Sequence, residues 1–394
     1  MKARSPGGNG WLWTVSTHSF FVQGFTAAFR PALAYAFIAA DVPIWMLGVL
    51  AASFSVPALA LALPIGRFVD VFGERRAALI GALSVAAGAL VALFGFSSPS
   101  LVLLASLLVG AGHMPSVIVG QVQVAHRTPR SRLDAIYGLY AFSSSCGQLI
   151  GPLLLIVVGG TRAVPDLELV FGGCVVLALG ILGAAAFFTP SRPPSSRVSQ
   201  GAPPGVLREA GRLIRHRGVV SALIVGSISV VAIDIVQVYW PALGVERGYD
   251  VVFVSIMLSL RAVMSMISRL IVGPVVARFG RLTVLMVSTI LAGISLAVTA
   301  LPLHEAFVLA AAVVLGFVLG VCQPLTMSWL AEITPAHNRG ASVSLRLAAN
   351  RVGQTLIPVC LGLVGGFAGA GGVVLIFAVM LCSSALLTRR PDER

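Results

Sequence analysis

The chain has 394 residues, of which 57% are hydrophobic and only 10% are charged, and its formal net charge at pH 7 is +13. Soluble domains carry roughly 25% charged residues, so this composition excludes a water-soluble enzyme. Apolar stretches run through almost the whole sequence. In such a chain each long stretch indicates a membrane span rather than the core of a soluble domain.

Twelve apolar runs lie between charged or proline- and glycine-rich breaks. A membrane-spanning helix needs about 20 apolar residues, and runs of this length exceed ordinary strands several-fold. We therefore predict an all-α membrane protein with twelve transmembrane helices. The predicted spans cover residues 11–38, 44–65, 77–96, 101–124, 134–158, 169–189, 219–243, 251–272, 282–302, 305–331, 341–365 and 370–388.

The basic residues are distributed unevenly between the two sides of these spans. With a cytoplasmic N-terminus, 20 of the 27 basic residues fall in cytoplasmic connections, only Arg162 and Arg247 fall on the other side, and five fall inside spans. Cytoplasmic connections are enriched in Lys and Arg. The sequence therefore predicts a multi-pass protein of a bacterial-type inner (plasma) membrane with both termini cytoplasmic. No nucleic-acid partner is needed to explain the charge.

The longest polar connection, residues 190–218, separates six spans from six. It begins with a serine- and proline-rich stretch and continues as the basic amphipathic segment LREAGRLIRHRG. This composition is typical of a flexible linker that leads into a surface helix. We predict an N-terminal six-helix bundle over 1–189, a cytoplasmic linker with an amphipathic basic helix over 190–218, and a C-terminal six-helix bundle over 219–394.

The two halves share motifs in the same order at an almost constant offset. Both halves begin on the same side of the membrane, so the pattern predicts a parallel duplication around a central site near the bilayer midplane. The matched pairs are Gly66/Gly273, Phe72/Phe279 and Gly73/Gly280 at an offset of 207, and Thr128/Thr334, Gln148/Gln354 and Pro152/Pro358 at an offset of 206.

The segment GRFVDVFGERR at residues 66–76, directly after the second span, resembles the loop 2–3 signature of the major facilitator superfamily. Together with the twelve spans, the duplication and the central linker, the resemblance covers essentially the whole chain. It implies two parallel-repeated six-helix bundles, secondary active transport by alternating access, and no cofactor. It also implies a conformational latch formed by Gly66, Asp70, Gly73 and Arg127, which in that family favours the outward-facing state.

Ionisable residues inside the spans are the first candidates for a substrate site, because a charge buried in the membrane is costly. Five are arginines and one is Asp234. Arginine binds carboxylates through fixed, bidentate donors, so we predict a small organic, carboxylate-type anion as substrate, with Asp234 as the proton-coupling or counter-charge group. The predicted substrate-binding residues are Arg30, Arg261, Arg269, Arg346 and Arg351, joined by Gln23, Asn350 and Gln354 on the same helical faces.

These ionisable residues also have a structural interpretation. Arg269 and Arg346 lie near the cytoplasmic ends of their spans, from which their side chains could extend to the lipid headgroups. Asp234 could serve as a structural partner that neutralises Arg30 or Arg261.

A narrower resemblance points to the monocarboxylate and oxalate/formate transporters. Arg269 precedes Gly273 by four residues, like the arginine of the eighth span in that branch, and GWLW at residues 10–13 is similar to its entry motif. Arg30 falls near the position of its first-span lysine. Ser265 stands where animal monocarboxylate carriers have an aspartate, so their proton relay is not carried over intact.

Two other functions compete with anion transport. GQLIGP at residues 147–152 is similar to the core of a drug/proton antiporter motif, although Gly147 and Gly151 equally suit close helix crossing. The alternatives are therefore multidrug efflux by drug/proton antiport and a transporter-like membrane sensor that moves nothing.

The sequence predicts neither an enzyme nor a metal or cofactor site. It contains no nucleotide-binding or hydrolase motif, and its five cysteines lie far apart inside apolar stretches. The expected partners are a small-molecule substrate, protons and the lipid bilayer, with the chain acting as a monomer.

Overall fold

The computed structural model describes residues 10–129, 132–160, 162–189, 211–216, 218–334 and 339–388. Within its helices, the side chains of residues 62–68, 70–72, 133–135, 339–341 and 343–344 lie outside this description, as does most of the predicted linker with its amphipathic helix. The described chain consists of helices and short connections. The helices are α1 (Gly10–Ala39), α2 (Trp45–Phe72), α3 (Glu74–Gly95), α4 (Pro99–Arg127), α5 (Leu133–Gly159), α6 (Leu167–Ala186), α8 (Val219–Arg247), α9 (Val251–Phe279), α10 (Arg281–Ala300), α11 (Glu305–Ile333) and α12 (Arg339–Ser384), followed by a 3-10 turn at Ala385–Thr388.

Helix α12 contains the last two predicted spans. Its path breaks at Gly369, whose φ of 67° and ψ of −177° are not helical. With its two arms counted separately, the described helices make twelve passes, which confirms the prediction of an all-α protein with twelve transmembrane helices. Within the described residues, nine helices meet a strict criterion of length and hydropathy for crossing a membrane.

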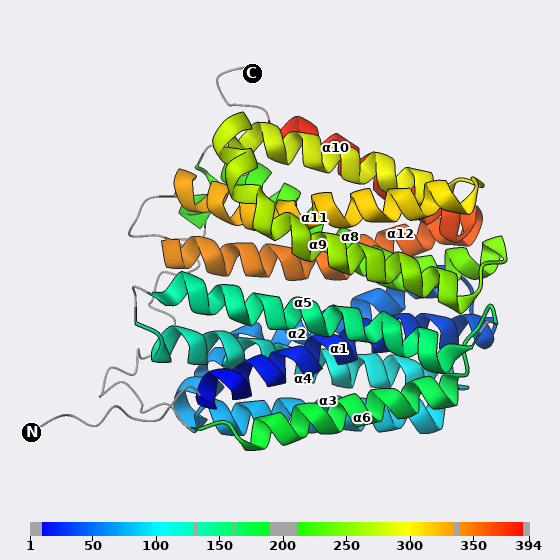
Figure 1. Ribbon diagram of the computed structural model, residues 1–394, viewed down its shortest axis with the longest axis horizontal. Coiled ribbons are helices and arrows are strands. Elements are labelled where there is room, and N and C mark those ends of the chain that lie inside the picture. Colours follow the sequence, from blue (N-terminus) through cyan, green and yellow to red (C-terminus); the bar gives the residue numbers. More distant parts are fainter. Residues whose placement is uncertain are drawn as a thin grey trace, which may run out of the picture.

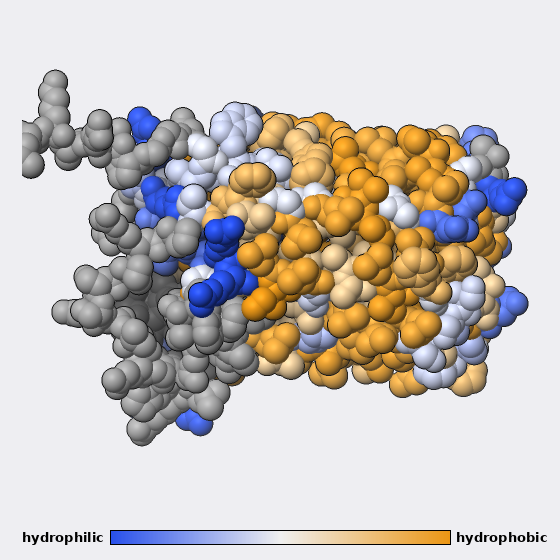
Figure 2. Space-filling view, turned by 90° about the horizontal axis from the view of Figure 1, so that it is seen from below, coloured by the Kyte–Doolittle hydropathy of each residue, from blue (hydrophilic) through white to orange (hydrophobic). Residues whose placement is uncertain are grey.

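The helices run along the long axis of the molecule, with α1–α6 in one half and α8–α12 in the other (Figure 1). Helix α1 begins and α12 ends at the same end of the bundle, called here the terminal end; the opposite end is the distal end. Figure 2 shows a broad apolar belt between polar ends. Such a belt is the surface that the hydrocarbon core of a bilayer requires.

The duplication predicted from the sequence is visible in the backbone. Gly73 joins α2 to α3 with φ 85° and ψ 159°, and Gly280 joins α9 to α10 with φ 79° and ψ 149°. This region of backbone conformation is essentially restricted to glycine. Helices α4 and α11 likewise both end at a threonine in extended conformation, Thr128 and Thr334, because a proline follows each.

A carboxylate and a basic side chain join the same two helix ends in each half, with the carboxylate on opposite helices. Glu74 at the start of α3 lies 3.6 Å from Nδ1 of His126 near the end of α4. Arg281 at the start of α10 forms an ion pair with Glu332 near the end of α11. Glu74 and Arg281 are 207 positions apart, and His126 and Glu332 are 206 apart, the offsets of the sequence repeat. The two halves therefore keep a side-chain pair at the same helix ends, although the residues that form it differ between the halves.

Glycines allow α1 and α5 to pack closely within the first half. A methyl group on Gly147 would overlap the backbone at Phe20, and one on Gly151 would overlap the backbone at Ala27. Small residues four positions apart permit such close crossings in membranes. Helix packing therefore accounts for both glycines of the GQLIGP segment.

The two halves meet at the distal end through α2 and α12. A methyl group on Gly48 would overlap the carbonyl oxygen of Pro358, and one on Gly362 would overlap that of Trp45. A hydrogen bond of 2.9 Å from the backbone N–H of Val251 to the carbonyl of Arg162 adds a second connection between the halves at this end. The backbones are thus in direct contact across the boundary between the halves.

Candidate functional site

An ion pair between the two halves lies at the centre of the molecule. Arg30 of α1 donates from Nη1 to Oδ1 of Asp234 on α8, and also to Oε1 of Gln237 at 3.0 Å. Only 6% of Arg30 and 3% of Asp234 are exposed. The Arg30 guanidinium also lies over the ring of Phe54 on α2, 4.8 Å from its centroid. Pairing and hydrogen bonding offset the cost of burying these two charges.

The pair continues into a hydrogen-bonded chain, called here the central network. The second carboxylate oxygen of Asp234 accepts from Nε2 of Gln354 on α12 at 2.8 Å. Oε1 of Gln354 accepts from Nη1 of Arg351 at 3.1 Å, and Nη2 of Arg351 lies 3.6 Å from the sulfur of Met114 on α4. The network starts in the first half on α1, crosses the second half on α8 and α12, and returns to the first half on α4. It therefore connects the halves twice.

The central network carries an excess of positive charge and unused donors. The network contains two guanidinium groups and one carboxylate: Arg30 pairs directly with Asp234, whereas Arg351 is connected to it through Gln354. Nη2 of Arg30 is buried without a hydrogen-bond partner in the described chain, as is Nε2 of His113, whose ring lies against Phe54 with centroids 5.3 Å apart. An anionic group entering here would find the unpartnered Nη2 donor of Arg30 already in place.

Two of the predicted arginines, Arg261 and Arg269 on α9, lie outside the central network. Nη1 of Arg269 donates to Oγ of Ser145 on α5 at 3.1 Å, so this half-buried side chain reaches from the second half to the first. Arg261 is 3% exposed, and its Nε has no partner in the described part of the chain. The substrate-binding set predicted from the sequence is thus divided between two places.

The remaining predicted residues are held within single halves. Arg346, 9% exposed, contacts α11 through the carbonyl of Gln323 at 3.3 Å and Oγ1 of Thr326 at 3.4 Å. Asn350 accepts a hydrogen bond of 3.3 Å from Ser227 on α8. Arg346 therefore points into the second half, and the structure does not extend it to the headgroups.

Equivalent glutamines occupy equivalent places in the two halves. Gln148 of α5 bonds to Gln23 of α1 at 3.4 Å, just as Gln354 of α12 bonds to Asp234 of α8 at 2.8 Å. The first half has an amide pair where the second half has an amide and a carboxylate. Of these two pairs, only that of the second half includes a carboxylate.

The residues of the implied latch are only partly described. Gly73 forms the turn between α2 and α3, whereas the side chain of Asp70 and the surroundings of Gly66 lie outside the described residues. Arg127 donates to the carbonyl of Thr189, and its guanidinium lies 6.0 Å from the ring centroid of Trp11. The contact between Asp70 and Arg127 stays a prediction.

Three residues that contact the buried arginines have no distinctive pattern in the sequence. Phe54, Met114 and Ser145 read as ordinary apolar or small residues of a span, yet they contact Arg30, Arg351 and Arg269. Their roles follow from tertiary packing. Within the described residues, no three His, Cys, Asp or Glu side chains gather into a group that could hold a metal ion.

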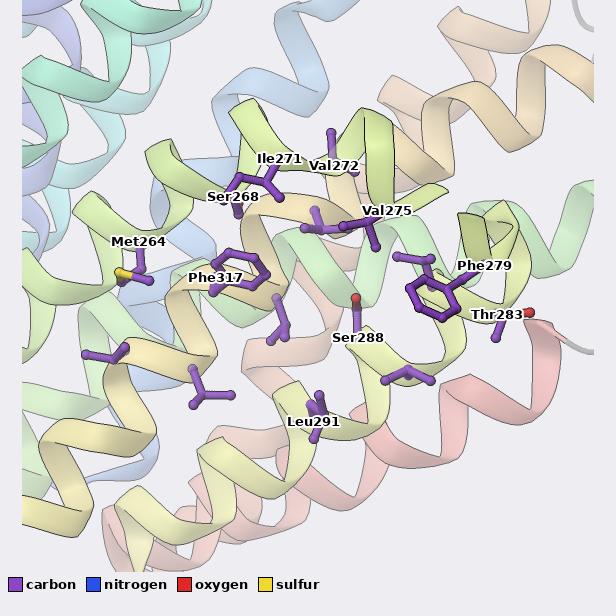
Figure 3. A pocket seen from close by; sticks show the side chains of 16 residues that line it. Met264, Ser268, Ile271, Val272, Val275, Phe279, Thr283, Ser288, Leu291 and Phe317 are labelled. Carbon is purple, nitrogen blue, oxygen red and sulfur yellow. The ribbon is translucent and has the colours of Figure 1, made fainter. Parts of the chain in front are cut away.

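A separate apolar cavity of about 550 Å³ lies between α9, α10 and α11 (Figure 3). Its lining includes Met264, Val275 and Phe317, with hydroxyl groups from Ser268, Thr283 and Ser288 as its polar side chains. No residue of the central network lines it. Several of its walls, such as Phe279 and Val287, are exposed on the outside of the bundle, so the cavity is a groove in the apolar belt.

These observations define a class of protein. The described helices make twelve passes in two similar halves, with charged and amide groups joined across the boundary between the halves, and this is the construction of a membrane carrier. A family model described as Major Facilitator Superfamily matches residues 15–252 and 222–394. The chain belongs to this superfamily, which supports secondary transport of a small molecule in general. No match was found among curated protein sequences.

Solved transporter structures share the fold at low sequence identity. A mutant of the nucleoside transporter NupG has a TM-score of 0.82 and 14% identity, covering 96% of this chain and 100% of that one. A D-xylose–proton symporter has a TM-score of 0.76 and 16% identity, covering 97% and 98%. The human organic anion transporter MFSD10 (TETRAN) has a TM-score of 0.66 and 14% identity, covering 98% and 100%. The fold prediction is confirmed, and the narrower resemblance to monocarboxylate and oxalate/formate transporters stays a prediction.

Proposed function

We propose that this protein is a proton-coupled secondary carrier that moves a small organic, carboxylate-type anion by alternating access. It acts as a monomer in a bacterial-type inner membrane with both termini in the cytoplasm. The terminal end of the bundle then faces the cytoplasm, in agreement with the asymmetry of basic residues. The bundles 1–189 and 219–394 rock about the centre, with residues 190–218 as the connection between them.

One observation carries the choice of an anion. Five arginines lie inside the spans against one aspartate, and Asp234 is already shared between Arg30 and Gln354. Buried charges without partners are costly, so uncompensated guanidinium groups are retained only where they have a use. A carboxylate supplies the missing negative charge and suits the paired donors of arginine.

Asp234 is the proposed site of proton coupling. When its carboxylate is ionised, it pairs with Arg30 in the other half. Protonation removes that charge, weakens the ion pair and frees the donors of Arg30 for the substrate. Proton and anion then cross together, and the next deprotonation restores the connection between the halves.

The structural neighbours are compatible with this proposal but do not select the substrate. Their titles name a nucleoside transporter, a D-xylose–proton symporter and an organic anion transporter. At 14–16% identity they share the fold with this chain. The anionic substrate therefore rests on the buried arginines.

Ligand-induced stabilisation of the purified protein tests the proposal. A ligand that binds only the folded state raises stability in proportion to ln(1 + [L]/Kd), so small carboxylates should raise the melting temperature and cationic dyes should not. The carboxylate effect should disappear in Arg351→Gln and persist in Arg278→Gln, an exposed arginine near the terminal end of α9. Stabilisation by cationic dyes that survives Arg261→Gln and Arg351→Gln, without any carboxylate effect, would instead support drug/proton antiport.

A further inference from the structure

The apolar groove between α9, α10 and α11 is formed by one face of each helix. On α10 the lining residues Thr283, Val287 and Leu291 lie four positions apart. Side chains at this spacing share one face of a helix. The lining residues of α9 and α11 include sets with the same spacing. Three helices of the second half thus turn an apolar face toward the same space.

The groove extends from the middle of the molecule to the terminal end. Met264 lies near one end of the groove, and Phe279 and Thr283 lie near the other (Figure 3). The interval of 15 residues from Met264 to Phe279 corresponds to about 22 Å of α-helix. Half of a hydrocarbon core of about 30 Å is about 15 Å. The groove is therefore long enough to follow a lipid chain through one leaflet of the bilayer.

Hydrocarbon chains of the bilayer are the natural occupants of this space. The groove has a volume of about 550 Å³ and opens in the apolar belt, where Phe279 and Val287 are exposed. Apolar walls without neighbouring atoms lose dispersion contacts, which a chain in the groove restores. Lipid tails are all similarly apolar, so the walls alone do not select one lipid over another. Any selectivity depends on the polar end of the groove.

A positive charge lies at that polar end. Arg278 is exposed, and its guanidinium lies over the ring of Phe279, 5.6 Å from the centroid. No carboxylate of the described residues pairs with Arg278, because the nearby Glu332 forms its ion pair with Arg281. Two arginines and one glutamate leave a net charge of +1. A guanidinium suits phosphate oxygens through its paired N–H donors.

The start of α10 adds to the attraction for an anion at this end. Helix α10 begins after Gly280 without a side-chain cap and without an acidic residue in its first turn. The equivalent helix of the first half, α3, has Glu74 in its first turn. Negative groups are stabilised near a helix N-terminus. The second half therefore lacks the carboxylate that the first half provides at the equivalent place.

We propose that this groove binds an anionic phospholipid. One acyl chain lies along α9 from Phe279 toward Met264, and the phosphate lies at Arg278 beside the start of α10. No residue of the central network lines the groove, so this lipid is a bound component of the membrane and a separate ligand from the transported solute. By filling the space between three helices, it stabilises the second half.

Native mass spectrometry of the purified full-length protein tests the headgroup assignment. The protein is mixed in detergent with equal amounts of dioleoylphosphatidylglycerol and dioleoylphosphatidylcholine, which share their chains and phosphate but differ in net charge. Wild-type protein should retain phosphatidylglycerol in about fivefold preference, the effect of one arginine near an anionic lipid. Arg278→Gln should abolish this preference. Arg76→Gln, which removes an exposed arginine at the start of α3, should keep it.

Filling the groove tests the position of the chain. Val287→Trp places a large side chain in the groove, so the rise in melting temperature caused by phosphatidylglycerol should disappear. Val176→Trp, at an exposed valine of α6 in the first half, is the matched control and should keep the rise. Val314→Trp fills the groove from α11 and replaces Val287→Trp if circular dichroism and elution volume show that the latter is misfolded.

Two results would overturn the proposal. Equal retention of the two lipids by the wild-type protein, or a preference that survives Arg278→Gln, would show that no anionic headgroup is selected at this end of α9. A preference that depends on Arg278, together with full stabilisation of a folded groove-filling variant, would show that the lipid lies on the surface and leaves the groove empty.

Discussion

Arg30 and Asp234 are 204 positions apart in the sequence and form a buried ion pair between the two halves of the molecule. The carboxylate uses one oxygen for α1 of the first half and the other for α12 of the second. A single titratable group is thus bonded to both halves. A change in the protonation state of Asp234 is the simplest local event that would alter the strength of the contact between the two halves.

The ion pair should respond to mutation as a unit. Arg30→Gln or Asp234→Asn alone leaves the other charge buried without its partner, and breaking a buried pair typically costs about 3–5 kcal/mol. The double variant Arg30→Gln/Asp234→Asn leaves two neutral groups that can still hydrogen-bond. We expect it to melt at a higher temperature than either single variant. Additive losses in the double variant would show that the pair does not act as a unit.

Asp234 should make uptake sensitive to a pH gradient. In proteoliposomes, wild-type uptake of a carboxylate should increase when the outside is made acidic, because the proton moves with the anion. Asp234→Asn resembles the protonated state permanently, so its remaining exchange should be insensitive to the gradient. Asp166→Asn, at the N-terminus of α6 and far from the centre in sequence and depth, serves as the control. A gradient response retained in Asp234→Asn places proton coupling elsewhere.

The distal contact between α2 and α12 should be required for closure of that end. Gly48→Leu places a side chain where the Pro358 carbonyl lies, so we expect the distal end to stay open and transport to fall to background. Accessibility can be measured at Ala51→Cys, since Ala51 is buried one turn further along α2. A membrane-impermeant maleimide added from the distal side should label this cysteine faster in the Gly48→Leu background.

Gly366→Ala is the matched control for the distal contact. A methyl group there meets the Trp45 side chain only at 3.9 Å, an ordinary contact, so labelling and transport should stay at the wild-type level. Equal labelling of Ala51→Cys with and without Gly48→Leu would mean that the contact does not close the distal end.

A side chain at position 280, in the turn between α9 and α10, should destabilise the protein. The φ of 79° and ψ of 149° at Gly280 lie in a region essentially restricted to glycine, so Gly280→Ala should destabilise the protein by about 1–3 kcal/mol. Gly273→Ala, seven residues earlier within α9, meets nothing within 4 Å and should leave the melting temperature unchanged or slightly raised. Similar melting temperatures for the two variants would contradict this difference.

Much of the fold could be predicted from the sequence because the membrane imposes strong local constraints. The twelve apolar runs, the one-residue turns at Gly73 and Gly280, and the prolines after Thr128 and Thr334 each determine local structure without reference to the rest of the chain. The break at Gly369 also lies between two predicted spans, although the helix around it is continuous enough to be assigned as one element.

The site was predictable only in part because its contacts depend on helix rotation and neighbour choice. Buried charge pointed to Arg30, Asp234 and Arg351, and helical spacing pointed to Gln354, all of which meet in the central network. Spacing could not show that Arg269 contacts Ser145 of α5, or that Arg346 contacts Thr326 of α11. Such contacts depend on which helices pack together; Gly316 and Gly320, for example, bring α11 close to α9.

Flux of a labelled organic anion into proteoliposomes tests the central claim most directly. With an acidic outside, the wild-type protein should accumulate at least one small carboxylate above protein-free vesicles, and Arg261→Gln and Arg351→Gln should reduce this accumulation to background while remaining folded. Carboxylate flux that persists in both variants would contradict the assignment of the arginines. No solute flux under any gradient would contradict transport itself and leave the membrane sensor as the remaining interpretation.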